Sequence, residues 1–360
     1  MSLVLGTLAI VSLFISFMAS ACLLAKTKQR FGTAQLEEPI SILKPLKGVD
    51  EGLYENLVAL ARQDYPHFEI LFGAEDADDP ALDVARRVQA EFPDVKMRIV
   101  LGAASDGLNP KVRLLRRLLP LATHEWILVS DSNVRPARSY LREIRACQEE
   151  TRADLVHNLL VGVGERSLGA KLENLHMNGW VSASIAFCDA GEHPCVIGKS
   201  MLMKKSSLAQ VGGFEDVRDI LAEDYILGSR FGAAGMKVVL SPHLLPVVSG
   251  ARDFGVFWNR HVRWGQLRRH IAPVFFLGEI FVNPLPFLIG WACVAGPEFR
   301  GFALAALAVK WLVDIAMWRR LGAGSSWSTF LWLPVKDSLI PLMWVTSGVR
   351  TRVSWRGNRM

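Results

Sequence analysis

An apolar segment without a single charge, Leu3 to Leu24, opens the chain and constrains its fold more than any other feature. A helix of about 22 residues reaches roughly 30 Å, the thickness of the hydrocarbon core of a bilayer. Basic residues follow this segment, at Lys26, Lys28 and Arg30. This order is typical of an uncleaved anchor rather than a signal peptide, and it predicts that the C-terminal end of the anchor faces the cytoplasm.

A second apolar region, 271–349, lies near the other end of the chain. Prolines interrupt its first part, 271–295, so we expect one half of that part along the membrane interface and the other half across the bilayer. Phe302 to Trp318 is an uninterrupted candidate for a spanning helix. Lys336 and Asp337 lie within the last apolar stretch, where unpaired charges cost several kcal/mol, and this favours a re-entrant or interfacial segment.

The net charge of +6 does not by itself indicate nucleic acid, because the basic residues are concentrated beside the apolar segments, at 26–30, 260–269 and 350–359. That placement suits anionic lipid headgroups, so a membrane is the predicted partner and nucleic acid is not. Nothing in the sequence indicates an obligatory protein partner. The five cysteines are odd in number and form no Cys-x-x-Cys pair, which favours a reducing compartment over a zinc site or a complete disulfide framework.

Between the apolar regions, strand-like and helix-like patterns alternate. We predict strands at 40–46, 68–73, 97–101 and 125–130, and helices at 53–63, 81–91 and 111–119. This alternation predicts an α/β fold with a parallel, Rossmann-like sheet, whose ligands lie at the carboxyl ends of the strands. The predicted parts are a transmembrane anchor (1–25), a connector (26–39), a catalytic domain (40–270), membrane or interfacial helices (271–349) and a basic cytoplasmic tail (350–360).

Three carboxylates, Asp76, Asp78 and Asp79, follow the second predicted strand and could accept hydrogen bonds from a uracil ring and a ribose. Asp79 precedes Pro80 and equally suits the cap of the next helix, a role that can coexist with ligand binding. Further along, Lys111 begins a basic helix, and its ammonium group and the first backbone N–H groups could hold a phosphate.

Asp131 directly follows the fourth predicted strand and is the candidate anchor of a divalent cation. Transfer from a sugar nucleotide must neutralise a leaving diphosphate, and Mg²⁺ or Mn²⁺ held by oxygen ligands does so. An Asp-x-Asp triplet is commoner in such cation sites. Here Asn133 takes the place of the second acid, and its amide oxygen is the only ligand atom that it offers to a cation. An ordinary Asx turn is the alternative interpretation of these residues.

Asp224, near the start of a predicted helix, is the candidate catalytic base. An acceptor hydroxyl has a pKa far above 7, so its attack needs a positioned carboxylate that takes the proton. The alternative interpretation is that the negative charge of Asp224 complements the helix dipole at the N-terminus of this helix.

Arg260, Arg263 and Trp264 share one face of a predicted helix at spacings of three and four residues. Two guanidinium groups could clamp a diphosphate while the indole packs against a sugar or an aglycone. A membrane-surface helix with arginines that reach toward the headgroups is the alternative, and both roles are compatible.

Taken in order, these motifs resemble those of the ceramide glucosyltransferases, glycosyltransferase family 21. The match covers nearly the whole chain outside the anchor and runs through 43–50, 64–66, 76–80, 107–111, 131–133, 222–225, 260–264 and 353–356. The resemblance implies a GT-A fold and inverting transfer of glucose from UDP-glucose to the primary hydroxyl of ceramide, with Mg²⁺ or Mn²⁺. It also implies that Asp79 and its neighbours contact the nucleotide, Asp131 the metal and diphosphate, and that Asp224 is the base.

By the same match, the residues of 260–264 would hold product-side phosphates and the acceptor. A histidine that some animal members carry before the third motif has no matched counterpart, although His176 lies nearby. Similar bacterial enzymes of the inner membrane would transfer N-acetylglucosamine from its UDP donor to a hopanoid lipid. A processive polysaccharide synthase is less well supported, because few helices remain to build a polymer channel, and a non-enzymatic nucleotide-sugar binder is the third alternative.

Overall fold

The computed structural model describes the chain except residues 33, 35, 325–326, 352–353, 356–357 and 360. Its described part divides into two compact units, each made of segments that are separate in the sequence. The first unit combines 1–27, 161–190 and 249–360, and the second combines 28–160 and 191–248. Val353 and Arg356, the ends of the last matched motif, lie outside the described residues.

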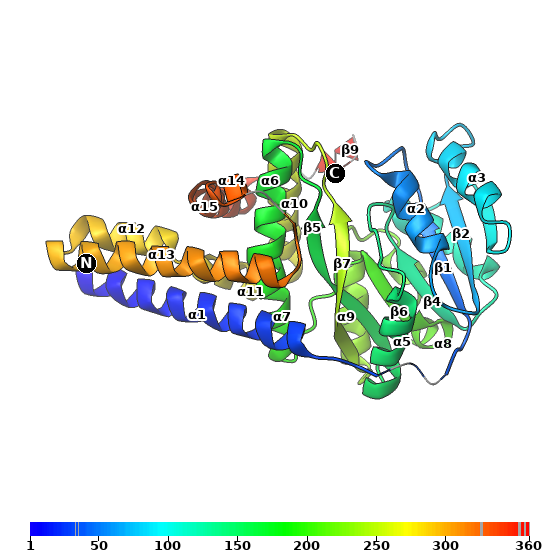
Figure 1. Ribbon diagram of the computed structural model, residues 1–360, viewed down its shortest axis with the longest axis horizontal. Coiled ribbons are helices and arrows are strands. Elements are labelled where there is room, and N and C mark those ends of the chain that lie inside the picture. The colour runs from blue at the N-terminus through cyan, green and yellow to red at the C-terminus, as the bar shows by residue number, and fades with distance from the viewer. Residues whose placement is uncertain (33, 35, 325–326, 352–353, 356–357, 360) are drawn as a thin grey trace. The chain divides into compact units, whose positions relative to one another are not determined.

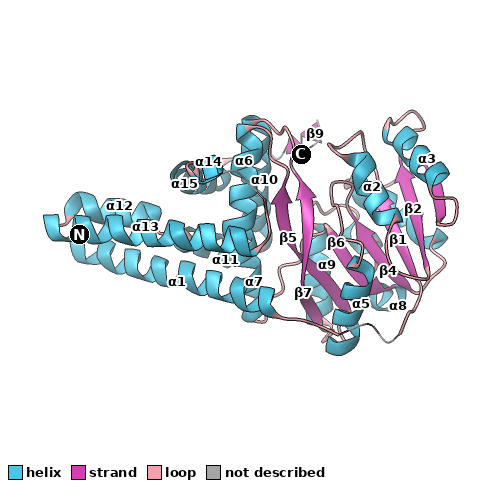
Figure 2. Cartoon of the chain, in the orientation of Figure 1, coloured by secondary structure: helices cyan, strands magenta, loops and turns pink. Residues whose placement is uncertain are grey.

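A seven-stranded sheet organises the second unit, with helices beside it (Figure 2). The strand order is β3-β2-β1-β4-β6-β5-β7. The first four strands are parallel, as predicted, because β1 pairs with both β2 and β4 while β2 pairs with β3. The strands are β1 (Ile40–Pro45), β2 (Phe68–Ala74), β3 (Lys96–Leu101), β4 (Trp126–Ser130), β5 (Leu155–Val163), β6 (Ser200–Lys204) and β7 (Val238–Val248).

The sheet is not parallel throughout, which corrects the sequence-based prediction. β6 pairs antiparallel with both β4 and β5, so it lies between two strands that precede it in the sequence. β1 and β4 are buried along their whole length and β6 at four of its five residues, which agrees with their mostly apolar sequences. The position of β6 puts the residues just before it next to the carboxyl end of β4.

The helices of the second unit begin and end close to the predicted residues. α2 and α4 differ from the predicted limits by one or two residues and α3 coincides with them. The helices and helical turns of this unit are α2 (Leu53–Ala61), α3 (Ala81–Glu91), α4 (Pro110–Leu118), η1 (Leu119–Leu121), α5 (Tyr140–Thr151), α8 (Lys205–Gln210), η3 (Glu215–Val217) and α9 (Glu223–Ala233).

The first unit is mainly helical (Figure 1). Its helices include a six-residue π-helix, η2, a type of helix whose backbone hydrogen bonds join residues five apart instead of four. The elements are α1 (Ser2–Lys28), α6 (Leu168–Leu175), η2 (His176–Val181), α7 (Ser182–Ala190), α10 (Phe254–Ile271), α11 (Pro273–Gly278), η4 (Glu279–Val282), α12 (Leu285–Val294), α13 (Pro297–Arg320), α14 (Trp327–Phe330), α15 (Leu333–Val349), β8 (Ser354–Trp355) and β9 (Asn358–Arg359).

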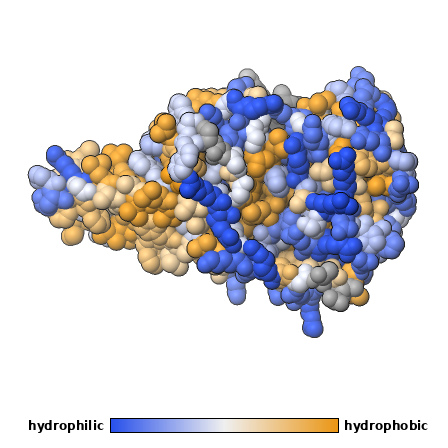
Figure 3. Space-filling view, in the orientation of Figure 1, coloured by the Kyte–Doolittle hydropathy of each residue, from blue (hydrophilic) through white to orange (hydrophobic). Residues whose placement is uncertain are grey.

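Two described helices, α1 and α13, are long and apolar enough to cross a membrane. The segment Pro273–Val282 and helix α12 together form a third candidate, bent by 57° at the break between them. Ala9 and Leu13 of α1 pack with Leu288 of α12 and Leu307 of α13 in one apolar cluster. Outward-facing apolar side chains cover the surface of these helices (Figure 3), as expected for contact with lipid.

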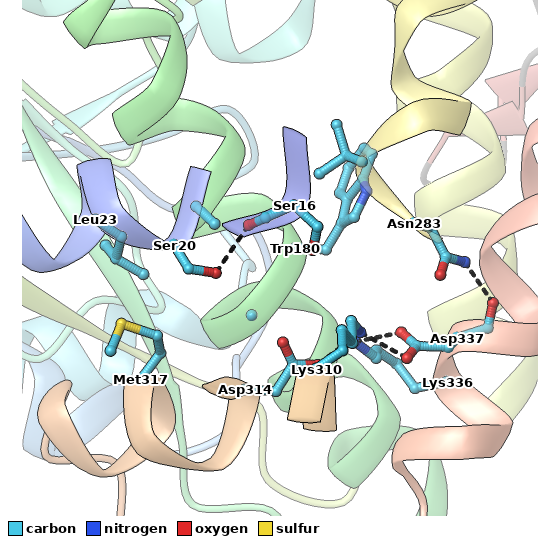
Figure 4. A pocket seen from close by; sticks show the side chains of 13 residues that line it. Ser16, Ser20, Leu23, Trp180, Asn283, Lys310, Asp314, Met317, Lys336 and Asp337 are labelled. Carbon is cyan, nitrogen blue, oxygen red and sulfur yellow. Dashed lines mark hydrogen bonds and ion pairs between the residues drawn. The ribbon is translucent and has the colours of Figure 1, made fainter. Parts of the chain in front are cut away.

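The charges of α15 are paired (Figure 4). Lys336 Nζ lies 2.6 Å from Asp337 Oδ1, and Lys310 Nζ of α13 lies 2.6 Å from Asp337 Oδ2. Asp314 accepts from Lys310 at 2.7 Å, and the indole N–H of Trp311 donates to Asp337 at 2.8 Å. Because these ion pairs compensate the charges of Lys336 and Asp337, the cost of burying unpaired charge does not apply to them. Their charges therefore do not decide whether α15 crosses the bilayer.

Candidate active site

The loops after β1, β2 and β4 are joined by polar contacts at the carboxyl edge of the sheet. The backbone N–H of Gly48, after β1, donates to both carboxylate oxygens of Asp79, after β2, at 3.0 Å. Lys47 pairs with Asp76 at 2.8 Å between the same two loops. Asp50, after β1, accepts a hydrogen bond from the hydroxyl of Ser132, after β4. These contacts form because parallel neighbours end at the same edge.

Asp79 is buried, whereas Asp76 and Asp78 are exposed. Besides Gly48, Asp79 accepts from the backbone N–H of Ala81 at 2.9 Å, at the start of α3. The capping interpretation therefore describes contacts that Asp79 makes in this structure. Asp76 and Asp78 keep exposed carboxylates beside this ordered loop, and the nucleotide contacts of all three acids stay a prediction.

Asp131 is surrounded by lysines. Lys111 Nζ lies 3.0 Å from Asp131 Oδ1, and Lys199 Nζ lies 2.7 Å from Asp131 Oδ2. Burial raises the pKa of Asp131, but the two ammonium groups outweigh it and hold that pKa well below the usual range. Lys44, at the end of β1, donates to the carbonyl oxygen of Asp131 and, at 3.1 Å, to the hydroxyl of Ser130.

Lys44 is fully buried, and this burial lowers its pKa to about 7 although the charge of Asp131 acts in the opposite direction. An ammonium group in such a place keeps its charge only through the oxygens that surround it. Lys44 belongs to the first matched motif, yet sequence reasoning gave it no role.

Lys111 connects the end of β4 with the start of α9. Its ammonium group lies 2.9 Å from Glu223 Oε1 and 2.9 Å from the carbonyl oxygen of Gly198. The backbone N–H of Gly198 donates to Asp224 Oδ2 at 2.5 Å. Asp131, predicted as the metal anchor, and Asp224, predicted as the base, are therefore joined through Lys111 and Gly198 within one unit.

Glu223 is a functional candidate that sequence reasoning missed. Burial raises its pKa, while Lys111 lowers it, and the balance lies above the usual value for a carboxyl group. Asn109, the cap of α4, donates to Glu223 at 3.0 Å and accepts from the backbone N–H groups of Lys111 and Val112. These N–H groups, which we predict as phosphate ligands, are thus bound by the side chain of Asn109 in this structure.

The oxygens predicted to hold a divalent cation belong to Asp131 and Asn133, and Lys199 Nζ lies 2.8 Å from Asn133 Oδ1. Carboxylate and amide oxygens suit Mg²⁺ or Mn²⁺, which commonly take one or two protein ligands together with substrate phosphates. Among the described residues, no group of three or more His, Cys, Asp or Glu could hold a metal by itself. The donor chemistry therefore fits a cation that arrives with a diphosphate, provided that Lys199 moves.

Arg260, Arg263 and Trp264 lie on α10, in the first unit, on one face as predicted. Arg260 lies 3.1 Å from Glu173 Oε1, and its guanidinium carbon lies 4.7 Å from the centre of the Trp264 ring. Arg263 is half-buried. Burial raises the pKa of Glu173, but the charges of Arg260 and Arg252 and a hydrogen bond with His261 hold that pKa well below the usual range. The clamping of a diphosphate by this face stays a prediction.

Comparison with known proteins yields one family and one fold. A family profile described as "Glycosyl transferase family 21" matches residues 4–360. The chain is 25% identical to "Ceramide glucosyltransferase 3" of Caenorhabditis elegans, over 89% of this chain and 72% of that protein. It is 26% identical to "Ceramide glucosyltransferase 1" of the same organism, over 89% of this chain and 71% of that protein.

Among solved structures, the chain resembles the mannosyltransferase PcManGT from Pyrobaculum calidifontis, solved in complex with GDP-Man and Mn²⁺. The TM-score is 0.58 at 16% sequence identity, and the likeness covers 96% of this chain and 98% of that one. At this level of identity the likeness concerns the fold. It confirms the predicted GT-A class.

Proposed function

The chain belongs to glycosyltransferase family 21, and from this premise we propose that it transfers glucose from UDP-glucose to the primary hydroxyl of a ceramide, with inversion at the anomeric carbon. The names of its relatives favour ceramide over a hopanoid acceptor. The observation that carries the proposal is the connection of Asp131 to Asp224 through Lys111 and Gly198 at the carboxyl edge of the sheet.

Asp224 is the proposed base. Its carboxylate oxygens accept from the backbone N–H groups of Gly198, at 2.5 Å, and Tyr225, at 2.8 Å, which fixes the orientation of the side chain. Each carboxylate oxygen has a second lone pair, so the group can still accept the proton of an acceptor hydroxyl. A base held in one orientation acts without first reorganising.

The leaving UDP carries the charge that the site must stabilise. Lys111 and Lys199 bring ammonium groups to Asp131, and Asp131 and Asn133 would hold Mg²⁺ or Mn²⁺. Such an ion supplies electrostatic stabilisation of a diphosphate. We further propose that Asp76, Asp78 and Asp79 lie near the nucleotide and that Arg260, Arg263 and Trp264 bind the departing phosphates and the acceptor.

The proposed acceptor is a lipid, which agrees with two helices long and apolar enough to cross a membrane. The basic residues after α1 favour a catalytic domain on the cytoplasmic side, and we propose the bacterial inner membrane as its location. Nucleic acid has no part in this proposal.

The test is transfer of radiolabelled sugar into extracted lipid by the purified full chain. The acceptors are ceramide and a hopanoid, each supplied with UDP-glucose or UDP-N-acetylglucosamine, and mass spectrometry identifies the product. Glucosylceramide formed by the unmodified chain, and not by Asp224→Asn, is the expected result. If label enters only the hopanoid, the acceptor is a hopanoid and not ceramide. A long labelled polymer would indicate a processive synthase. The absence of any labelled product would indicate a protein that binds nucleotide sugars without transferring them.

A further inference from the structure

Lys199 occupies the oxygens that a divalent cation would use. Its ammonium nitrogen lies between Asp131 Oδ2, at 2.7 Å, and Asn133 Oδ1, at 2.8 Å. The backbone of Lys199 is also bound to Asp131, because the carbonyl oxygen of Lys199 accepts from the backbone N–H of Asp131 at 3.2 Å. Lys199 therefore stays next to Asp131 whether or not its side chain is bound there.

The ammonium groups around Asp131 are already engaged by oxygens of the chain. Lys111 binds Asp131 and Glu223, Lys199 binds Asp131, and Lys44 binds backbone and hydroxyl oxygens. A nucleoside diphosphate sugar adds about two negative charges, and uncompensated charge in a partly buried site is costly. The donor must therefore either bring a cation or release a lysine from its present partners.

A divalent cation and the ammonium group of Lys199 cannot both use the same two oxygens, since like charges that close repel strongly. The side chain of Lys199 is 13% exposed and that of Asp131 is 22% exposed, so solvent reaches the pair. A lysine ammonium on four rotatable methylene groups can leave this position without a change in the backbone.

We propose that Lys199 is an exchangeable counter-cation: it holds Asp131 and Asn133 in the donor-free protein and gives up these oxygens when a divalent cation enters with a nucleoside diphosphate. The released ammonium group then faces the negatively charged donor. Lys199 is thus a positioning residue for the donor, an inference that rests on the proposed function. Cation binding and nucleotide binding are coupled, because each favours the state in which Lys199 has left.

The test measures cation binding rather than transfer. The purified full chain is titrated with Mn²⁺, with and without UDP, and free Mn²⁺ is followed by electron paramagnetic resonance. Lys199→Met keeps much of the apolar stem and removes the competing charge, so Mn²⁺ binding without UDP should tighten about twofold to fivefold, as expected for one partly exposed ion pair. The factor by which UDP improves Mn²⁺ binding should shrink in this variant.

Lys96→Met is the matched control, because Lys96 also pairs with a carboxylate of the second unit, Glu69, at 3.4 Å. It should leave Mn²⁺ binding unchanged, and Asp131→Asn should weaken it in the Lys199→Met background. Unchanged or weaker Mn²⁺ binding by Lys199→Met would overturn the inference, as would absence of Mn²⁺ binding in every variant. Because no lipid is present, failure of glucose transfer to ceramide would leave a positive Mn²⁺ result standing.

Discussion

Gly198 donates its backbone N–H to Asp224 at 2.5 Å, while its carbonyl oxygen accepts from Lys111 at 2.9 Å. A Cβ atom at position 198 would lie 2.8 Å from Lys111 Nζ and 2.9 Å from Asp224 Cβ. Only glycine lets the proposed base and the lysine that binds Asp131 approach one backbone segment this closely.

Gly198→Ala should therefore reduce glucose transfer at least about tenfold, since small displacements of reacting groups are costly. The fold should persist, because the displaced atoms border a partly exposed site. Initial rates and the thermal unfolding midpoint check this. Gly232→Ala is the control, because a Cβ there meets no atom within 4 Å. A Gly198→Ala variant with normal rates would show that the close approach is unimportant.

Asp224→Asn should keep UDP-sugar binding and lose transfer, because asparagine preserves the shape of the side chain but cannot take a proton. A general base contributes about 10²-fold to 10⁴-fold, so the turnover number should fall by that order. Turnover under saturating substrate is measured beside UDP affinity, with the exposed Asp94→Asn as control. Turnover near that of the unmodified chain would remove Asp224 from the role of base.

Asp131→Ala should weaken metal-dependent donor binding by about tenfold or more, because it removes the carboxylate proposed to hold the cation and leaves two lysines without their shared partner. Calorimetric titration with UDP and Mn²⁺ measures the change, and Asp94→Ala tests for an effect of net charge. Affinity equal to that of the unmodified chain would contradict a role for Asp131 in donor binding.

Asn109→Ala should destabilise the second unit by about 1–2 kcal/mol, because it removes the cap of α4 and a hydrogen bond to buried Glu223. Asn109→Asp can keep the cap but places a carboxylate against Glu223, so it should not restore stability. Thermal unfolding of the two variants separates the contributions. Equal stability of Asn109→Asp and the unmodified chain would show that the contact with Glu223 contributes little.

Glu69 should make the stability of the folded protein depend on pH in the acidic range. Burial raises its pKa, but hydrogen bonds from Thr123 and Ser41 and the charge of Lys96 outweigh this and bring it from 4.5 to about 2. A carboxyl group with a depressed pKa in the folded state stabilises the protein above its unfolded pKa, and this contribution is lost as pH falls through the folded pKa.

The unfolding midpoint of the unmodified chain should thus exceed that of Glu69→Gln at pH 6, and the difference should shrink as the pH approaches 2. Measurements on both proteins in the same buffers and detergent cancel the titration of other groups. A difference that stays constant with pH would mean that Glu69 acts through packing and not through its charge.

The alternating strands and helices from 40 to 130 could be predicted because each depends on local periodicity and on punctuation by glycine, proline and capping residues. The placement of Asp131 after a buried strand is equally local. The sequence also identified Asp224 as an acid at a helix start, and motif order identified the family, which the profile match confirms.

The lysine environment of Asp131 depends on long-range pairing that no local pattern reveals. β6 follows β4 by about 70 residues and inserts between β4 and β5, and this insertion brings Lys199 and Gly198 to the end of β4. The ion pair between Asp337 and Lys310 likewise joins two helices separated by a loop. Asp131 looks isolated in the sequence because its lysine partners lie far away along the chain.

The sequence by itself determined which segments are apolar enough to enter a membrane, which segments form strands, and which acids follow them, because these properties belong to neighbouring residues. Only the tertiary structure decided what each acid touches: Asp79 binds backbone N–H groups, and Asp131 binds Lys111 and Lys199. The physical reason is that ion pairs and hydrogen bonds depend on distances of about 3 Å between side chains, and such distances are set by strand order and packing.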